Sequence, residues 1–430
     1  MRILIVSRTP WSEENSFGNT FSNLFGGMED VIIYNICCQD GNINNNIVYS
    51  TFQMDDISVL KSIFGYTPGK NIINAPKYHC KDQTTRSPNI LPHRRLTLFF
   101  IIRDLIWKFG RWKKNSALNE FIKLANPDII YLPLYASWYM CDVDKYIINN
   151  CKAPVVGHIS DDIYSYPPLL SGSPLFQFYR FILRIKLRQL FKLVSYCEVF
   201  AQNMKCEYER LFNIPFYVIG KGIDENMPDN TYESVRKKQD CIKFVYTGNI
   251  GGGRYKVLAD LAHAIDLSFQ EGDAILEIYS QTHIDKKIKK AFSSCHSLYF
   301  KGSISKNEIS KVQMDSDFLV HVEGFDKKSI FETRMSFSTK IIDYIMMRKP
   351  IFAIGPLSVN SISYLNDNKL ALVASDKHEI QSALSKIQIG KIDTIDLVNS
   401  SLDFIKRERN LKKIQGEMHS RMTSLLENKK

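Results

Sequence analysis

Short runs of apolar, mostly β-branched residues alternate with segments of helical length along almost the whole chain. Most of these runs are continuously apolar, which is typical of parallel strands that are buried on both faces of a sheet. The strand–helix–strand repetition predicts right-handed crossovers and a doubly wound parallel sheet. The predicted strands are 2–7, 31–35, 128–133, 154–159, 198–203 and 216–220, then 242–247, 275–280, 298–301, 317–322, 350–354 and 371–374.

The pattern stops and restarts once, after a polar stretch at 221–240 that has no apolar periodicity. A length of 430 residues is compatible with two such domains. We therefore predict an α/β chain with one Rossmann-like domain at 1–222, a second at 223–400, and a charged C-terminal helix at 401–430 that packs back toward the first domain. The segment 41–93 is rich in Asn, Pro and polar residues, and we expect loops there.

Open α/β sheets restrict where ligands bind, because the crevices lie at the carboxyl ends of the parallel strands. Two such edges that face each other across a central cleft would enclose a ligand between the domains. The loops that follow the predicted strands are therefore where we expect functional residues.

A polar loop enters a predicted helix near residue 340. Ser338, Thr339 and Lys340 lie at the start of this helix, and Asp343 follows one turn later. A Ser or Thr in this position caps free N–H groups, and the remaining N–H groups with the helix dipole favour an anion. We expect a phosphate-binding helix start, with Asp343 available to hydroxyl groups of the ligand. The alternative is an ordinary capped helix that leads into a buried strand.

A glycine-rich loop, TGNIGGGR, follows the first strand of the second half at residues 247–254. Its glycines, Gly248 among them, allow a ligand to approach the backbone closely, and Arg254 can clamp phosphate oxygens. Lys256 is a candidate second cation or a solvated helix residue. The loop lacks the spacing of a dinucleotide fingerprint, and a tight strand-to-helix turn is the alternative.

A third segment, GHISDD, follows a predicted strand of the first half. His158 and Asp161 suit hydroxyl recognition or acid–base chemistry on a strand-end loop. The alternatives are a structural histidine and carboxylates that cap the next helix. Gly18 lies in a loop-like segment after the first strand and is a weak candidate by itself.

In their order along the chain, these segments resemble the GT-B glycosyltransferases, and the second half is similar to glycosyltransferase family 4, of the type that builds bacterial surface polysaccharides. The matching segments are NPDIIYLP (126–133), EVFAQNMKCEYERLFNIPFYVIGKGID (198–224), YTGNIGGGR (246–254) and FSTKIIDYIMMRKPIFAIGP (337–356). The resemblance implies a GT-B fold, with an acceptor domain followed by a nucleotide-sugar donor domain. It also implies a retaining reaction that needs no bound metal.

The resemblance also implies roles for the candidate residues. Arg254 and residues 338–340 would hold the donor diphosphate, with Gly18, Gly248 and Lys256 nearby. Asp343 would bind the nucleotide ribose, while His158 and Asp161 would face the acceptor. The sequence departs from the family pattern where two glutamates usually stand: Asp343 replaces the second, and Met335 occupies the position of the first. Arg348 replaces the usual glycine before Lys-Pro.

The positive charge is concentrated in two windows. The chain carries a net charge of +11, and all of this excess lies in 94–114, with seven basic residues and one acid, and 176–192, with five basic residues and no acid. Arg180, Arg184, Arg188 and Lys192 recur every four residues and predict one basic ridge on a helix. We expect these helices to contact an anionic membrane surface. A solvated helix face is the alternative, and no nucleic-acid-binding motif accompanies the charge.

The expected location is cytoplasmic, peripheral on the cytoplasmic face of the inner membrane. The start, MRILIVSRTPW, lacks the apolar region of a signal peptide, and no run reaches membrane-spanning length. The nine cysteines show no metal-ligand spacing and are expected to be reduced, and no metal or cofactor is expected.

Together these features predict a glycosyltransferase that moves a sugar from a nucleotide-diphosphate donor to a lipid-linked or growing surface oligosaccharide. One alternative is a nucleotide-sugar epimerase on the same scaffold. The other is a non-enzymatic two-domain sugar-binding protein.

Overall fold

The computed structural model describes residues 1–73, 97–165, 173–224 and 241–427. The chain forms two compact units, which we call the first and the second unit. The first contains Met1–Phe200, Met204–Gly222 and Leu411–Lys430, and the second contains Ala201–Asn203 and Ile223–Asn410. The main division therefore lies at Gly222, the end of the first predicted domain. The polar linker predicted at 225–240 lies outside the described residues.

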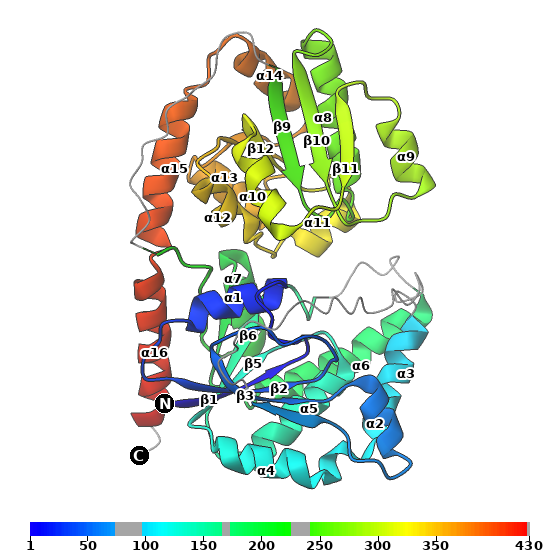
Figure 1. Cartoon of the computed structure of the whole chain (residues 1–430), viewed down its shortest axis with the longest axis vertical. Coiled ribbons are helices and arrows are strands. Elements are labelled where there is room, and N and C mark those ends of the chain that lie inside the picture. Colours follow the sequence, from blue (N-terminus) through cyan, green and yellow to red (C-terminus); the bar gives the residue numbers. More distant parts are fainter. Residues whose placement is uncertain (74–96, 166–172, 225–240, 428–430) are drawn as a thin grey trace. The chain divides into compact units, whose positions relative to one another are not determined.

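An eight-stranded sheet runs through the first unit (Figure 1), in the order β4-β3-β2-β1-β5-β6-β7-β8. All neighbouring strands are parallel except β3 and β4, which are antiparallel. β1, β5 and β6 are almost entirely buried, as their continuous apolar sequences predict. The strands are β1 (Arg2–Ser7), β2 (Ile32–Cys37), β3 (Val48–Gln53), β4 (Lys70–Ile73), β5 (Ile129–Pro133), β6 (Val155–Ile159), β7 (Tyr196–Val199) and β8 (Phe216–Val218).

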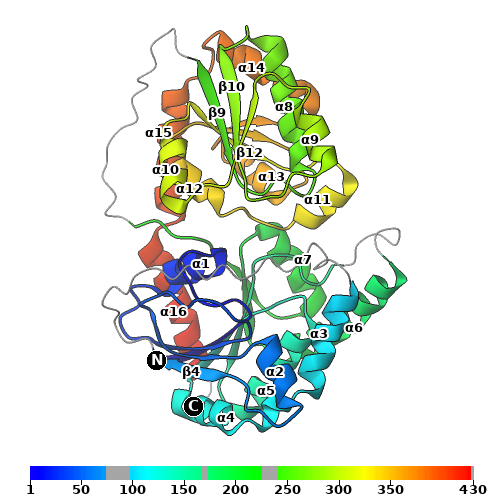
Figure 2. The same ribbon diagram turned by 45° about the vertical axis from the view of Figure 1, so that its right-hand side comes forward.

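The helices of the first unit include a group that packs together in both views (Figures 1 and 2). α3 contacts α2, α5 and α6, and α5 also contacts α6. Elsewhere in the unit, α1 contacts α16. The helices are α1 (Ser16–Phe25), α2 (Asp56–Ser62), α3 (Thr97–Phe109), the 3-10 helix η2 (Arg111–Lys114), α4 (Ser116–Ala125), α5 (Trp138–Asn150), α6 (Pro174–Phe191), α7 (Gln202–Phe212) and α16 (Leu411–Glu427).

The second unit has a six-stranded, wholly parallel sheet in the order β11-β10-β9-β12-β13-β14. The strand order reverses between β9 and β12, so this is the topological switch point where open α/β sheets bind ligands. The strands are β9 (Ile242–Thr247), β10 (Ala274–Tyr279), β11 (Leu298–Gly302), β12 (Phe318–Val322), β13 (Ile351–Ile354) and β14 (Leu372–Ala374). The helices are α8 (Arg254–Ser268), α9 (Lys286–Phe292), α10 (Lys306–Met314), α11 (Lys327–Thr333), α12 (Lys340–Met346), α13 (Asn360–Asp367), α14 (Lys377–Gln388) and α15 (Thr394–Glu408).

The predicted doubly wound α/β fold is confirmed, with differences in detail. β3, α2 and β4 lie in the segment 41–93, where loops were expected, and residues 74–93 of that segment lie outside the described residues. The strand predicted at 198–203 ends at Val199, because α7 begins at Gln202. The predicted single C-terminal helix is interrupted at Arg409–Asn410, where the backbone N–H of Ile223 donates to the Arg409 carbonyl. α15 therefore belongs to the second unit and α16 to the first.

Among the described helices, none has both the length and the apolar character needed to cross a bilayer.

Candidate functional site

The carboxyl end of β9 is fixed by side chains from other elements of the second unit. The last residue of β9, Thr247, accepts a hydrogen bond on Oγ1 from Gln313 Nε2 at 2.8 Å. The hydroxyl of Tyr344 on α12 lies 3.0 Å from the same Oγ1 and donates to the Thr247 carbonyl at 3.2 Å. Since all three groups are buried, this network holds α12 against the strand end.

The glycine-rich loop packs tightly against the segment that follows β12. Gly252 and Gly253 adopt positive φ angles of 61° and 79°, which favour glycine. A Cβ on Gly253 would lie 2.7 Å from both Asp326 Oδ2 and Ser329 Oγ. The predicted close approach therefore exists at Gly253, but its partner is another loop of the same unit.

Arg254, the first residue of α8, reaches the carboxyl end of β12. Its Nε donates to the Val322 carbonyl at 3.3 Å, and its Nη2 contacts both carboxylate oxygens of Glu323, at 3.1 and 2.9 Å. Burial raises the pKa of Glu323, and the charge of Arg254 opposes that rise. The predicted phosphate clamp thus carries its own counter-ion in this structure.

Glu323 was not among the site residues predicted from the sequence. Its position could have indicated it, because it is an acid that directly follows the strand β12 and precedes Gly324. Met335, which occupies the position of the first glutamate of the family pattern, is buried. The nearest glutamate in the sequence before it, Glu332, lies on the surface near Lys328. The acid that meets Arg254 therefore comes from an earlier segment than the expected one.

Lys340 is the second cation at this edge of the sheet. Its Nζ donates to the Thr247 carbonyl at 3.1 Å and lies 2.4 Å from where a Cβ on Gly248 would be. The residue remains exposed, yet partial withdrawal of its ammonium group from water and the nearby charge of Arg254 lower its pKa. The structure therefore brings Gly248, Arg254 and Lys340 together at this edge of the sheet.

The other residues predicted to bind the nucleotide sugar make fewer contacts at this edge of the sheet. Thr339 precedes α12 with a helical backbone and makes no side-chain cap, so the prediction of a cap is wrong for Thr339. Ser338 is half-buried beside it. Asp343 is half-buried in the first turn of α12, one turn from Lys340, whose pKa its charge raises. Lys256 is exposed and lies 6.0 Å from the Tyr255 ring.

A buried histidine extends the charged cluster inward. His321 on β12 lies 3.2 Å from Ser361 Oγ through Nε2, and the same nitrogen is 3.9 Å from Glu323 Oε1. Burial, with smaller contributions from the charges of Arg254 and Lys340, lowers its pKa to about 3. The imidazole is therefore neutral at physiological pH, and the charge of the cluster resides on Arg254, Glu323 and Lys340.

In the first unit, His158 lies inside β6, within the strand predicted at 154–159 and not on the loop that follows it. Its ring is buried between Phe21 and Phe200, at centroid distances of 5.0 and 4.9 Å. Burial lowers its pKa to about 3. The strand continues to Ile159 because this whole apolar run is covered on both faces.

A chain of buried polar groups ends at His158. The Tyr131 hydroxyl donates to Glu198 Oε2 at 2.8 Å, and Glu198 Oε1 accepts from Arg421 of α16 at 2.9 Å. Because the only Tyr131 proton is committed, its oxygen accepts from His158 Nδ1, 3.0 Å away. This order leaves Nε2 of the neutral ring as an acceptor for Ser160 Oγ at 3.2 Å. Ser160, which is exposed, is the outermost group of this hydrogen-bonded series.

The remaining candidates of the first unit have different environments. Asp161 is exposed after β6. Its neighbour Asp162 accepts from the Ser165 amide and the Tyr208 hydroxyl, at 2.9 and 2.7 Å, and so has a structural role. Gly18 is buried within α1 and not in a loop. A Cβ there would lie 2.0 Å from the Ser12 carbonyl oxygen, which explains the glycine by packing alone.

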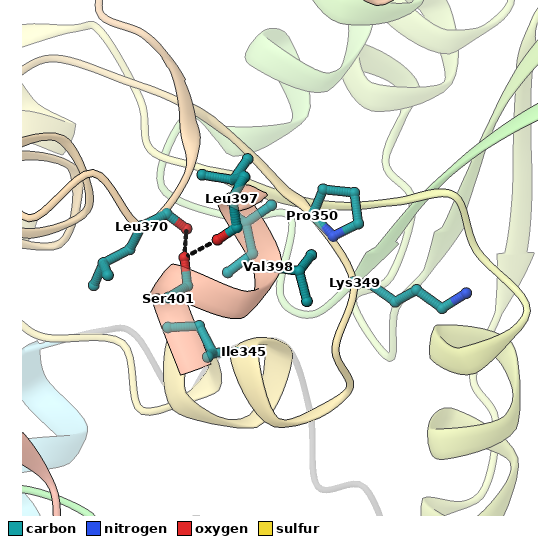
Figure 3. A pocket seen from close by; sticks show the side chains of 8 residues that line it. Ile345, Lys349, Pro350, Leu370, Leu397, Val398 and Ser401 are labelled. Carbon is teal, nitrogen blue, oxygen red and sulfur yellow. Dashed lines mark hydrogen bonds between the residues drawn. The ribbon is translucent and has the colours of Figure 1, made fainter. Parts of the chain in front are cut away.

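Two depressions in the second unit lie away from the predicted residues. The one in Figure 3, between α12, β13 and α15, has no room for a water molecule, and Ser401 Oγ there donates to the carbonyls of Leu370 and Leu397 at 3.2 and 2.6 Å. A more open depression of about 580 Å³ lies near Lys369, Lys391 and Arg407. Within the described ranges, no group of three histidine, cysteine or acidic side chains is placed to hold a metal ion.

No protein-family model and no curated protein matches the sequence. The structure resembles solved structures across its length. Anabaena HepE in complex with UDP and glucose has a TM-score of 0.63 at 11% identity, covering 99% of this chain and 100% of that one. A structure described as trehalose-6-phosphate from E. coli bound with UDP-2-fluoro glucose has a TM-score of 0.65 at 11% identity, covering 98% and 99%. The fold is GT-B.

A third similar structure also covers both chains. The lipopolysaccharide outer core galactosyltransferase WaaB has a TM-score of 0.55 at 11% identity, covering 98% of this chain and 100% of that one. Because the coverage is nearly complete in each case, the GT-B fold extends over both units. At these identities the likeness concerns the fold, and the roles of individual residues have to be argued from their chemistry.

Proposed function

We propose that the chain is a glycosyltransferase that transfers a sugar from a nucleotide-diphosphate donor to a lipid-linked or growing surface oligosaccharide. The observation that carries the proposal is the placement of Arg254 and Lys340 at the switch point between β9 and β12. A GT-B fold supports it, since two similar structures contain UDP with glucose or a UDP-sugar.

The two cations suit the charge that develops when a nucleoside diphosphate leaves the sugar. Fixed cations aimed at a developing negative charge stabilise a transition state strongly, because they need no reorganisation. In the proposed complex, the diphosphate accepts hydrogen bonds from Arg254 and Lys340 and competes with Glu323 for the guanidinium group. Gly248 leaves room for phosphate oxygens near Lys340, and Asp343 accepts from the ribose hydroxyls.

In the proposal, the acceptor binds to the first unit at the carboxyl end of β6. The exposed hydroxyl of Ser160, held by the neutral His158, and the exposed carboxylate of Asp161 are the groups that orient an acceptor hydroxyl there. A neutral imidazole adds no charge that would repel an approaching proton. The proposed location is the cytoplasmic face of the inner membrane, where lipid-linked acceptors are presented.

The proposed reaction retains the anomeric configuration and uses no bound metal, with the positive charges of Arg254 and Lys340 in place of a metal ion. Transfer assays with labelled nucleotide sugars and a lipid-linked oligosaccharide acceptor would test the proposal, and chelation with EDTA should leave the rate unchanged. Labelled sugar in the acceptor supports the proposal. Epimerised free nucleotide sugar, or tight binding of free sugar without nucleotide affinity, would replace it with an epimerase or a binding protein.

Replacement of Arg254 tests the phosphate clamp. Arg254→Ala should weaken binding of nucleoside diphosphates at least about tenfold, because the lost hydrogen bonds to charged groups are worth about 1.5–3 kcal/mol. Binding of the corresponding nucleoside should change little. Isothermal titration calorimetry measures both, and Lys289→Ala, an exposed cation on α9, is the matched control. Equal loss for nucleoside and diphosphate would contradict the clamp.

Replacement of Asp343 tests ribose recognition. Asp343→Ala should reduce the preference for ribonucleoside over 2′-deoxyribonucleoside diphosphates, because the acceptor of the ribose hydroxyls is removed. Competition binding against the two nucleotide forms measures the preference. Asp367→Ala on α13 serves as the control. An unchanged preference in Asp343→Ala would show that another group reads the ribose.

A further inference from the structure

The outward face of α3 is apolar. Leu98, Ile102, Leu105 and Phe109 follow one another at helical spacing and are 55%, 44%, 40% and 66% exposed. The inward face carries Trp107, which is 1% exposed, and Asp104, which accepts from the Tyr179 hydroxyl at 2.9 Å. α3 is therefore apolar on both sides, whereas a surface helix of a globular protein normally has a polar outward face.

The neighbouring helix α6 carries a second exposed apolar stripe. Phe178, Phe181 and Ile185 are 56%, 56% and 41% exposed, while Leu183 and Leu187 on the opposite side are buried. The two helices are in contact and lie side by side in both views (Figures 1 and 2). Two outward apolar stripes on adjacent helices form the kind of surface that marks an interaction site in a soluble domain.

The exposed charged side chains of α3 and η2 themselves are all basic, and the neighbouring α2 contributes the exposed Asp56, which accepts from Trp107 Nε1 at 2.7 Å. Lys108, Arg111, Lys113 and Lys114 are all exposed on α3 and η2, and the only acid between residues 97 and 114 is the buried Asp104. Arg188 and Lys192 are exposed at the end of α6.

The basic ridge predicted for α6 is only partly present. Arg180 is buried and donates to the carbonyls of Ile163 and Ser165, and Lys186 pairs with Asp142. Arg184 is half-buried over the Tyr164 ring, at 4.4 Å. Arg94 and Arg95 of the other basic window lie outside the described residues. Apolar side chains therefore occupy much of the surface where the sequence predicted mainly charge.

We propose that the exposed stripes of α3 and α6, with the cations of η2, dock on an anionic lipid bilayer. The apolar side chains enter the boundary between head groups and acyl chains, and the cations contact the anionic head groups. The charge pattern favours this occupant, because the exposed cations of α3, η2 and the end of α6 lie beside the apolar stripes and complement an anionic bilayer. The inference extends the proposed function, but its test requires no sugar transfer.

Vesicle flotation of the full chain tests the docking surface. The chain should float with phosphatidylcholine vesicles that contain phosphatidylglycerol and bind far less to phosphatidylcholine alone. High salt should weaken the binding without abolishing it, because the apolar contribution is not screened. Ile102→Glu combined with Phe178→Glu should reduce the affinity at least about tenfold, whereas Leu267→Glu, at a 76% exposed position on α8, should not.

Two charge-reversal variants distinguish the effect of the cations on η2 from the effect of the net charge of the chain. Lys113→Glu with Lys114→Glu should weaken binding more than Lys289→Glu with Lys290→Glu on α9, although the change in net charge is the same. Circular dichroism checks that each variant is folded. Phe178→Trp offers a conservative second measurement, because its emission should shift to the blue on vesicle binding and be quenched by spin-labelled lipid.

Three results would overturn the proposal. The first is a wild-type chain that does not bind the anionic vesicles. The second is a folded Ile102→Glu, Phe178→Glu variant that binds as well as the wild type. The third is a wild-type dimer, seen by sedimentation equilibrium, that the same variant converts to a monomer while vesicle binding is unchanged; the surface would then be an interface between two copies.

Discussion

His158 and His321 occupy corresponding places near the carboxyl ends of buried strands in the two units. Each ring is buried, and burial lowers the pKa of each to about 3. Neither ring carries charge in the working pH range, so each acts through a fixed pattern of donor and acceptor nitrogens. For His158 that pattern is set by Tyr131 and Glu198. These histidines therefore orient neighbouring groups and do not supply charge.

The lowered pKa of His158 predicts a pH-dependent stability. In the unfolded chain His158 is protonated below a pKa of 6.5, whereas in the folded chain it stays neutral down to about pH 3. The unfolded state therefore binds more protons in this window, and the free energy of unfolding falls as the pH falls through it. His158→Gln should remove up to about 1.4 kcal/mol per pH unit of that slope. Urea unfolding between these pH values measures it. His283→Gln, at an exposed position, should keep the wild-type slope; an unchanged slope in His158→Gln would contradict the prediction.

Among the elements, α12 shows how a sequence departure is tolerated. Arg348, which stands where the family that the sequence resembles usually carries glycine, lies just after the helix and has a φ of 55°. This left-handed conformation at the end of a helix favours glycine, since a side chain there costs about 1–2 kcal/mol. The turn is nevertheless needed, because it leads from α12 through Pro350 into β13.

Arg348→Gly should therefore raise the free energy of unfolding by about 1 kcal/mol relative to Arg348→Ala. Both variants remove the arginine side chain, so their difference isolates the backbone conformation. Thermal or urea denaturation of the two variants measures it. If the alanine variant is as stable as the glycine variant, the left-handed conformation carries no cost at this position.

At the scale of the whole molecule, the end of the chain returns to the first unit. α16 contacts α1, and Gln415 donates to the carbonyls of Asn23 and Gly26. Arg421 of α16 forms an ion pair with the buried Glu198. Burial raises the pKa of Glu198, and the positive charge of Arg421 limits that rise. The same carboxylate anchors the polar chain that ends at His158. The last helix thus supports both the stability of the first unit and the arrangement of its candidate site.

Removal of this arginine should be costly. Arg421→Ala leaves the Glu198 carboxylate buried without its cation and should lower the free energy of unfolding by about 3–5 kcal/mol. Combining Arg421→Met with Glu198→Gln should recover much of the loss, because no buried charge then remains. Lys412→Ala, an exposed position on α16, should have little effect. Equal stability of Arg421→Ala and Lys412→Ala in urea unfolding would refute the role of the pair.

Several parts of the fold were predictable from local sequence. Strands such as β5 and β13 are continuous apolar runs, and such runs fold as buried parallel strands wherever both faces are covered. β3 was missed because its Ser50, Thr51 and Gln53 are polar yet buried. Ser50 donates to Asn71, and Gln53 donates to two carbonyls of a distant loop. Only the folded chain supplies these partners.

The sequence by itself determined the doubly wound α/β architecture, and it placed Arg254 and Lys340 where a loop leads into a helix. Periodicity predicts these features, since it depends on neighbours along the chain. The tertiary structure decided that Glu323 pairs with Arg254, that His158 is buried between two aromatic rings, and that an apolar stripe of α3 faces outward. Burial and pairing depend on which distant segments pack together, and a helix or strand pattern is compatible with more than one such packing.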